Sequence, residues 1–208
     1  MSSIRNAYNN WSETYDTVEN KTRDLDAKAL KAATDSIEFR DALEIGCGTG
    51  KNTECLAGIA KRLTAVDFSE GMLEKARNKV HAPNVSFQQM DITTGWQLTA
   101  NSFDFACCNL ILEHVKDLHF VFTEAARVLR PGGHFFISEL HPFKQYTGSK
   151  ARFEKEGELI ILDTYLHHTS EYLSAAKAAN LSLVDLTEWF DDDNKDLPRI
   201  LALLFRKQ

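Results

Sequence analysis

The sequence predicts an α/β protein with a doubly wound, mostly parallel, seven-stranded sheet that carries helices on both faces. Apolar segments of strand length alternate with segments of helical periodicity from residue 41 onward. A glycine-rich stretch follows the first strand, as it does at the ligand-binding edge of such sheets. The last two strands are separated by about ten residues, too few for a helical crossover, so one antiparallel strand is expected near the edge of the sheet.

The order of the elements follows from these patterns. Two helices are expected before the first strand, over residues 3–16 and 24–39. Strands are then predicted at ALEIG, RLTAVDF, NVSFQQMD, SFDFACCNL and HFFISEL. The intervening helices are expected over residues 51–60, after the N-cap Ser69, and over residues 118–129, where RPGG is expected to end the helix. An irregular polar insert, a helix over residues 169–179 and the strands LSLVDLTEW and RILALLFRK complete the chain.

Composition narrows the classes of protein to consider. The 208 residues hold 24 Lys and Arg against 30 Asp and Glu, so a long nucleic-acid partner is not expected. No run reaches the roughly 18 apolar residues of a membrane span, and the first residues lack the apolar core of a signal peptide. The four cysteines form no CxxC pair and are interpreted as small buried side chains in a reducing compartment. A cytoplasmic protein without a membrane partner is therefore expected.

The stretch LEIGCGTG marks the candidate ligand site. Gly46, Gly48 and Gly50 follow the first strand, and the lack of side chains lets a ligand lie against the backbone. The spacing lacks the sixth-position glycine of the dinucleotide fingerprint, and there is no GxxxxGK[ST], so neither a nicotinamide oxidoreductase nor a P-loop protein is favoured. The alternative is a loop that only makes a tight turn.

Two carboxylates at successive strand ends indicate which ligand the loop would take. Asp67 ends the second strand, where it can accept hydrogen bonds from both hydroxyls of a ribose. Asp91 follows the third strand, where it can accept from an exocyclic amine. Each residue alone could be a cap or a solvated strand end, but together with the loop they describe a nucleoside pocket at one edge of the sheet.

Five motifs occur in order between residues 42 and 140: LEIGCGTG, AVDFSEGMLEKA, FQQMDI, FDFACCNLILEHVKD and LRPGGHFFISEL. Their set and order resemble the class I S-adenosylmethionine-dependent methyltransferases, above all the small "methyltransferase type 11" group, which includes quinone-ring methyltransferases. The resemblance implies the Rossmann-like methyltransferase fold, S-adenosyl-L-methionine as the cofactor and S-adenosyl-L-homocysteine as the product. The segment YNNWSETYD is similar to the aromatic lid helix of that group.

The resemblance also implies which residues bind the cofactor. Asp67 would bind the ribose hydroxyls and Asp91 the adenine amine, with Phe68 and Met72 on either side of the adenine. The full set implied is Glu44, Gly46, Cys47, Gly48, Gly50, Asp67, Phe68, Met72, Asp91, Ile92, Asn109, Trp11 and Tyr15.

Within that set, the residues at the methionine end of the cofactor have separate roles. By the resemblance, Glu44 orders the region around the amino group through water, and Asn109 lies near the methionine part. The lid aromatics Tyr8, Trp11 and Tyr15 either close over the pocket or pack against the edge of the sheet.

The reaction implied is an in-line displacement at an activated methyl group, in which the protein aligns the nucleophile and excludes water. A base is needed only if the acceptor must lose a proton. His114, after the fourth strand, and His141, after the fifth, are the candidate catalytic residues, although His114 could instead cap the next helix. Further candidates are Glu113, Glu139, His167 and His168.

The insert is the expected cover over the substrate. Its candidate substrate-binding residues are Lys144, Tyr146, Lys150 and Arg152. Such cations suit an acceptor with a carboxylate or phosphate, and the alternative is a solvated face balanced by nearby glutamates. No metal site is predicted, because the acidic turn at residues 191–193 has no His or Cys in ligand spacing.

These observations predict a single methyltransferase domain over residues 1–208. Its parts are N-terminal lid helices (1–40), a cofactor-binding core (41–140), a substrate-cover insert (141–157) and a C-terminal helix with closing strands (158–208). The expected activity is methyl transfer to a small molecule, possible acceptors including one with an anionic group. The alternatives are a protein or RNA methyltransferase and a non-catalytic nucleoside-binding protein of the same fold. The oligomeric state stays open.

Overall fold

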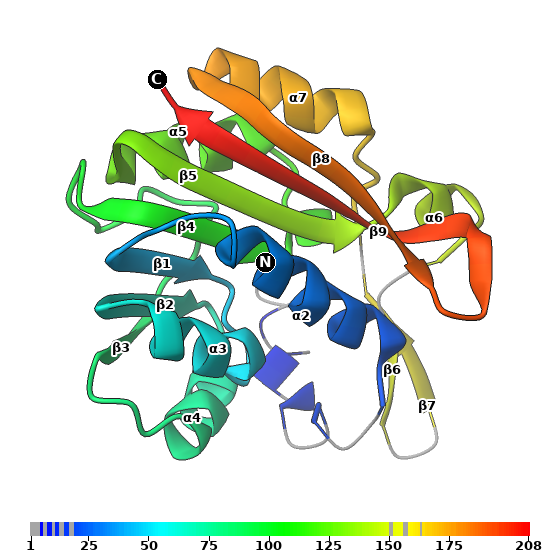
Figure 1. The fold of residues 1–208 in the computed structure, drawn as a ribbon. Coiled ribbons are helices and arrows are strands. Elements are labelled where there is room, and N and C mark those ends of the chain that lie inside the picture. The colour runs from blue at the N-terminus through cyan, green and yellow to red at the C-terminus, as the bar shows by residue number, and fades with distance from the viewer. Residues whose placement is uncertain are drawn as a thin grey trace.

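The computed structural model describes residues 5, 8, 9, 11, 12, 15, 16, 19–149, 152–155, 158–162 and 164–208, with the backbone alone for 152–155 and 158–161. A seven-stranded sheet forms its centre (Figure 1). The strands, in their order across the sheet, are β3 (Val85–Gln89), β2 (Arg62–Asp67), β1 (Asp41–Ile45), β4 (Phe103–Asn109), β5 (Leu129–Leu140), β9 (Asn194–Lys207) and β8 (Leu181–Asp191).

The pairing of the strands confirms the predicted fold class. The strands from β3 to β5 pair in parallel, and β9 runs antiparallel to both β5 and β8. The reversed strand is thus second from one edge. The order of the strands reverses between β1 and β4, so the loops that follow these two strands diverge to opposite sides and leave a crevice at their carboxyl ends.

Helices cover both faces of the sheet. Figure 1 shows α2 crossing one face, with α5 and α7 on the other side. The helices are α2 (Lys21–Thr34), α3 (Lys51–Ile59), α4 (Glu70–Lys79), α5 (Leu118–Val128), α6 (Pro142–Tyr146) and α7 (Thr169–Ala178), with a 3-10 turn, η1, at Leu112–His114. Cys107 packs into the core on the side of α2, and its neighbour Cys108 packs against α5, as alternation along a strand requires.

Side-chain caps explain where two of these helices begin. Ser69, the predicted N-cap, accepts a hydrogen bond from the backbone N–H of Met72 and starts α4. Asn20 accepts from the N–H groups of Thr22 and Arg23, so α2 begins earlier than the apolar pattern predicts. Among the described residues, no helix is both long and apolar enough to cross a bilayer.

The structure corrects three details of the sequence-based description. The RPGG segment does not cap α5, because Leu129 is already extended and Gly132 lies within β5 with a φ of 80°. The insert is not irregular throughout: Pro142 at the first position favours the short helix α6. Strands β6 (Arg152–Lys155) and β7 (Glu158–Ile161) then form a hairpin. Cys55 is exposed, unlike the other three cysteines.

The predicted helix over residues 3–16 falls largely outside the described residues. Of those that are described, residues 5, 8, 9 and 11 are helical.

Candidate active site

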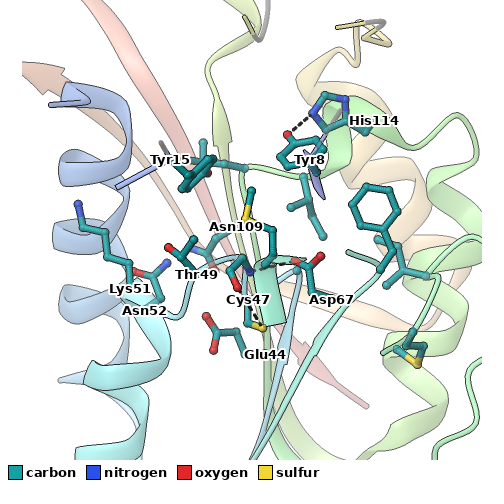
Figure 2. A pocket seen from close by; sticks show the side chains of 18 of the residues that line it. Tyr8, Tyr15, Glu44, Cys47, Thr49, Lys51, Asn52, Asp67, Asn109 and His114 are labelled. Carbon is teal, nitrogen blue, oxygen red and sulfur yellow. Dashed lines mark hydrogen bonds between the residues drawn. The ribbon is translucent and has the colours of Figure 1, made fainter. Parts of the chain in front are cut away.

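A pocket, here called the inner pocket, lies at the carboxyl ends of β1, β2 and β4, beneath part of the N-terminal segment (Figure 2). Figure 2 shows Lys51 and Asn52 on one side, Asp67 on the other and Tyr8 with His114 above. Every member of the predicted cofactor-binding set lines this pocket except Gly50 and Trp11.

The three glycines of the loop serve different purposes. All have positive φ, at 75° for Gly46, 53° for Gly48 and 85° for Gly50. A Cβ at Gly46 would lie 2.7 Å from Ile111, whereas one at Gly48 would meet no atom within 4 Å. A Cβ at Gly50 would come within 3.1–3.3 Å of Val80 and Ala76, at the carboxyl end of α4. Gly48 therefore leaves open space on the pocket wall, and Gly50 permits close packing of α3 on α4.

Asp67 joins the loop to the end of β2. Its two carboxylate oxygens accept from the backbone N–H groups of Gly48 and Ser69, each at 2.9 Å. The residue is only 6% exposed. Burial raises the pKa of Asp67 to about 6, although the amide donors oppose the shift. One buried carboxylate thus holds the loop and still faces the pocket.

The adjoining side of the pocket is largely apolar. Phe68 and Met72 line it beside Ile92. Asp91 accepts from the backbone N–H of Thr93 at 3.0 Å and from its hydroxyl at 2.6 Å. Arg5 from the N-terminal segment contacts the other oxygen of Asp91 at 3.5 Å. An aromatic ring, a thioether and a carboxylate on one wall suit a purine with an exocyclic amine.

The opposite end of the pocket is polar and acidic. Asp26, on α2, accepts from the side-chain amides of Asn109 at 2.6 Å and Asn52 at 3.0 Å. Glu44 accepts from the Thr53 hydroxyl at 2.6 Å. Burial raises the pKa of Glu44 to about 8, and it raises the pKa of Asp26 as well. These acids lie next to the cations Arg23 and Lys51 on the pocket wall.

Polar contacts fasten the N-terminal segment across the pocket. The Asn9 side chain accepts from the Ser69 hydroxyl at 2.6 Å. Asp16 accepts from the Thr49 hydroxyl at 2.8 Å and from Lys79 at 3.2 Å. The described part of the segment is thus bound to both the glycine loop and α4.

The aromatic residues of that segment line two adjacent cavities. Tyr8 lies 2.8 Å from His114 through a hydrogen bond, and its ring meets Phe68 edge-on at 5.7 Å. Tyr8 and Tyr15 line both the inner pocket and a neighbouring cavity, whereas Trp11, which packs against Tyr15 at 4.8 Å, lines only the neighbouring cavity. Of the predicted lid aromatics, Tyr8 and Tyr15 thus reach the inner pocket and Trp11 does not.

This neighbouring cavity, here called the outer cavity, shares Tyr8, Tyr15, Arg23 and Leu110 with the inner pocket. Four cations line it: Lys21, Arg23, Lys144 and Arg199. Three of them have carboxylate partners: Lys21 pairs with Asp193, Arg23 with Asp16, and Arg199 with Asp191. Within the described part of the chain, the Lys144 ammonium has no ion pair and acts on Asp191 at longer range.

Glu113 is a partly buried acid of the outer cavity, with 13% of its side chain exposed. The side-chain amide of Gln145, on α6, donates to it at 3.3 Å, and His114 lies 4.0 Å away. Burial raises the pKa of Glu113 to about 7, so both protonation states are accessible near neutral pH. A group of this kind can take or give a proton.

Comparisons with known proteins bear directly on this geometry. The family described as "Methyltransferase domain" matches residues 43–137. A Ubiquinone biosynthesis O-methyltransferase from Coxiella burnetii is 31% identical over 161 residues, which cover 73% of this chain and 68% of the relative. The chain belongs to the class I S-adenosylmethionine-dependent methyltransferases. The enzyme therefore uses S-adenosylmethionine and releases S-adenosylhomocysteine.

Solved structures agree on the fold of this methyltransferase. The DhpI–SAH complex superposes with a TM-score of 0.78 at 22% identity, covering 99% of this chain and 96% of that one. A methyltransferase from Mesorhizobium loti has a TM-score of 0.73 at 22% identity, covering 88% and 98% of the two chains.

The inner pocket of the methyltransferase fits its cofactor on two independent observations. The backbone at Gly48 is open to a ligand, since no atom lies within 4 Å of its Cβ position. The side-chain oxygen of Asn109 is buried without a hydrogen-bond partner in the described structure, so a ligand donor could satisfy it.

The predicted catalytic and substrate residues lie in different surroundings. His114 lines the inner pocket. His141 caps α6 and lies 2.9 Å from Glu188, and it is not among the residues lining either cavity. Tyr146 bonds to His168. Lys150 lies outside the described residues, and for Arg152 only the backbone is described.

Sequence reasoning missed part of the site. The missed residues of interest are Arg23, Asp26, Asn52 and Arg199, which come from α2, α3 and β9. The sequence did contain a signal for Asp26. This acidic residue lies three and four positions before the buried Ala29 and Leu30, so it shares the buried face of the helix. Among the described residues, no group of three or more His, Cys, Asp and Glu side chains is arranged to hold a metal ion.

Proposed function

We propose that the methyltransferase carries the methyl group of S-adenosylmethionine to a hydroxyl oxygen of a small acceptor that bears an anionic group. The outer cavity carries this proposal, because it shares a wall with the inner pocket and collects four cationic side chains. An anion there would meet Lys144, whose ammonium pairs with no carboxylate among the described residues. The name O-methyltransferase of the Coxiella relative supports oxygen as the acceptor atom.

The adenosine part of the cofactor is assigned to the side of the pocket formed by β2 and β3. Asp67 would accept from both ribose hydroxyls while it keeps its backbone donors. Phe68, Met72 and Ile92 would surround the adenine, and Asp91 would accept from its amine. The burial and the wall chemistry of these residues support the assignment.

The methionine part is assigned to the end near β4. The backbone at Gly46, Cys47 and Gly48 would face the ribose and the methionine chain. Arg23 and Lys51 are the cations on the wall that could pair with the methionine carboxylate. Gly50 would act indirectly, by allowing α3 to begin close to α4.

The chemistry asked of the protein is mostly placement. The cofactor supplies a methyl group that its sulfonium already activates. Tyr8, Tyr15 and Leu110, which lie between the two cavities, would align the acceptor oxygen and keep water away. Glu113 would accept the hydroxyl proton as the oxygen attacks, with His114 and Tyr8 beside it.

Of the catalytic residues expected from the sequence, His114 stays in this proposal through its contacts with Tyr8 and Glu113. His141 stays a prediction, and its bonds to Glu188 and to α6 favour a structural role. A protein or RNA acceptor is the weaker alternative, because three of the four cavity cations are already ion-paired. The cytoplasmic location also stays a prediction.

The test offers hydroxy acids and phenolic acids in pairs with their primary amides, and it measures release of S-adenosylhomocysteine. At least one acid should be methylated faster than its amide. Lys144→Ala should raise the KM for that acid by about tenfold or more, the scale of one charge-assisted hydrogen bond, and spare the KM for S-adenosylmethionine. Lys61→Ala is the matched control, because Lys61 is exposed at the start of β2, away from the pocket.

Two results would contradict an anionic acceptor. The first is wild-type enzyme that methylates acids and amides equally well. The second is a Lys144→Ala variant that loses activity to the same degree on both members of a pair.

A further inference from the structure

Asp26 is a buried carboxylate on the wall of the inner pocket that forms no ion pair with the cations near it, Arg23 and Lys51. It lies in the second turn of α2 and is 3% exposed. Both of its hydrogen-bond donors at the pocket wall, Asn109 and Asn52, are neutral amides. Among the described residues it has no ion pair, since Lys51, the cation that acts on it at longer range, bonds to Asp24 instead. A buried ionised carboxylate is costly unless a cation pairs with it.

Asn109 provides a second unsatisfied acceptor at the same place. Its amide nitrogen donates to Asp26 at 2.6 Å, which directs the amide oxygen to the other side. The other end of the amide, Oδ1, is buried and has no hydrogen-bond partner in the described structure. Most buried polar atoms have a hydrogen-bond partner, so this oxygen is a candidate acceptor for a donor on a ligand.

The two observations specify a chemical group. A ligand group that satisfies both must carry positive charge and several N–H donors. The sulfonium of S-adenosylmethionine is positive but has no hydrogen to donate. The α-ammonium of the methionine part has a full charge and three donors.

We propose that Asp26 and Asn109 bind the α-ammonium group of the cofactor, with Asp26 as its charge partner and Asn109 as a second acceptor. Glu44, to which the sequence resemblance gave the amino group, lines the same pocket but already accepts from the Thr53 hydroxyl at 2.6 Å. The inference rests on the proposed placement of the cofactor in the inner pocket. It predicts that the protein selects for the amine through a residue of helix α2, outside the glycine loop.

The experiment uses calorimetry with three ligands that share the adenosine part and differ in the methionine part. S-adenosylhomocysteine has the amine and the carboxylate, S-adenosyl-4-thiobutyrate lacks only the amine, and 5′-methylthioadenosine lacks both. Wild-type protein should bind S-adenosylhomocysteine at least tenfold more tightly than the thiobutyrate. Asp26→Asn should weaken S-adenosylhomocysteine by about ten- to hundredfold, the scale of a hydrogen bond to a charged group, and leave the other two ligands within about twofold.

Matched variants separate this role from general damage. Asp35→Asn makes the same change at the exposed end of α2 and should leave all three affinities unchanged. If Asp26→Asn does not fold, as judged by circular dichroism, Asn109→Ala replaces it and should weaken only S-adenosylhomocysteine. Asp67→Asn should weaken all three ligands alike, because each contains the ribose.

Three outcomes would overturn the inference. One is wild-type protein that does not discriminate between S-adenosylhomocysteine and the thiobutyrate. Another is a loss of affinity in Asp26→Asn that is equal for S-adenosylhomocysteine and the thiobutyrate. The third is loss of amine selectivity in Glu44→Gln while Asp26→Asn retains it. Failure of the cofactor placement itself looks different: 5′-methylthioadenosine would then bind with the same affinity to wild type and to Asp67→Asn.

Discussion

Asp67 has two tasks that depend on the same charge. It holds the glycine loop through the N–H of Gly48, and it is the proposed acceptor for the ribose hydroxyls. Because burial raises its pKa to about 6 in the free protein, the carboxylate takes up a proton within an accessible pH range. A protonated Asp67 accepts fewer hydrogen bonds, so cofactor binding should be sensitive to mild acid.

We therefore expect the affinity for 5′-methylthioadenosine to be constant above about pH 7 and to fall by up to tenfold per pH unit below about pH 6. This ligand has no amine or carboxylate that would confuse the titration. Asp67→Asn should weaken binding at pH 7.5 by roughly 1.5–3 kcal/mol and flatten the dependence on pH. Calorimetry from pH 5 to pH 8 measures both effects. An unchanged affinity in Asp67→Asn, or a pH profile identical to that of wild type, would contradict this role.

At the scale of an element, the loop between β1 and α3 contains two glycines that look alike in sequence and differ in structure. Gly48 has open space where a Cβ would be, whereas Gly50 has atoms of Val80 and Ala76, at the carboxyl end of α4, within 3.1–3.3 Å. Both have positive φ, so a side chain at either position costs about 1–2 kcal/mol from backbone strain alone. What differs is the second effect of each substitution.

Gly48→Val should greatly reduce binding of S-adenosylhomocysteine while it lowers stability only by the strain. Gly50→Val should lower stability by considerably more, because its side chain must displace α4, and the affinity of the remaining folded protein should suffer less. Denaturant unfolding and calorimetry on both variants measure the two quantities. Normal cofactor affinity in Gly48→Val would mean that the loop is a turn and does not contact the ligand.

The pocket shows which elements a sequence pattern can locate. Asp67 and Asp91 could be predicted because parallel strands end at one edge, so their positions follow from the order of strands and helices. Asp26 was overlooked because it lies in a helix whose apolar spacing indicated only a core-facing surface. Its role depends on Asn109, 83 residues away, and no local period encodes that contact.

The outer cavity shows the same limit more strongly. The motif after the fourth strand drew attention to Glu113 and His114, and the insert drew attention to Lys144. Arg199, however, joins that wall from β9 and bonds to Thr22, 177 residues earlier in the chain. Only the complete sheet, with β9 antiparallel beside β5, brings these residues together.

At the scale of the whole molecule, the buried acids of the site link the stability of the cofactor-free enzyme to pH. Glu44, Asp26 and Asp67 are acids with less than a tenth of their surface exposed, gathered around one pocket. Burial raises the pKa of Glu44 to about 8, and the neighbouring Asp26 and Asp67 push it in the same direction. In the unfolded chain the same carboxyl has its ordinary pKa near 4.5, so it is ionised throughout the neutral range.

The sign of the resulting pH dependence follows from proton counting. Between about pH 4.5 and pH 8 the folded state holds a proton on Glu44 that the unfolded state has lost. Stability is therefore highest at the acidic end of this window and declines as the pH rises toward 8. Over pH 6 to pH 8, Glu44 alone should lower the free energy of unfolding by roughly 2 kcal/mol. Glu113, whose pKa burial raises to about 7, adds to the decline at the lower end of that range.

We expect denaturant unfolding of the cofactor-free protein to give a lower free energy of unfolding at pH 8 than at pH 6. Glu44→Gln should remove roughly 2 kcal/mol of that difference and stabilise the protein at pH 8, because a neutral amide of similar shape replaces an acid that must be buried charged or hold a proton. Glu38→Gln makes the same change on an exposed residue of the α2–β1 connection and controls for net charge alone. Equal slopes in wild type and Glu44→Gln would assign the pH dependence to other groups.

A cationic cofactor at the pocket would favour the ionised acids. Saturating S-adenosylmethionine should therefore stabilise wild type more at pH 8 than at pH 6, and Glu44→Gln should show less of this gain in the free energy of unfolding.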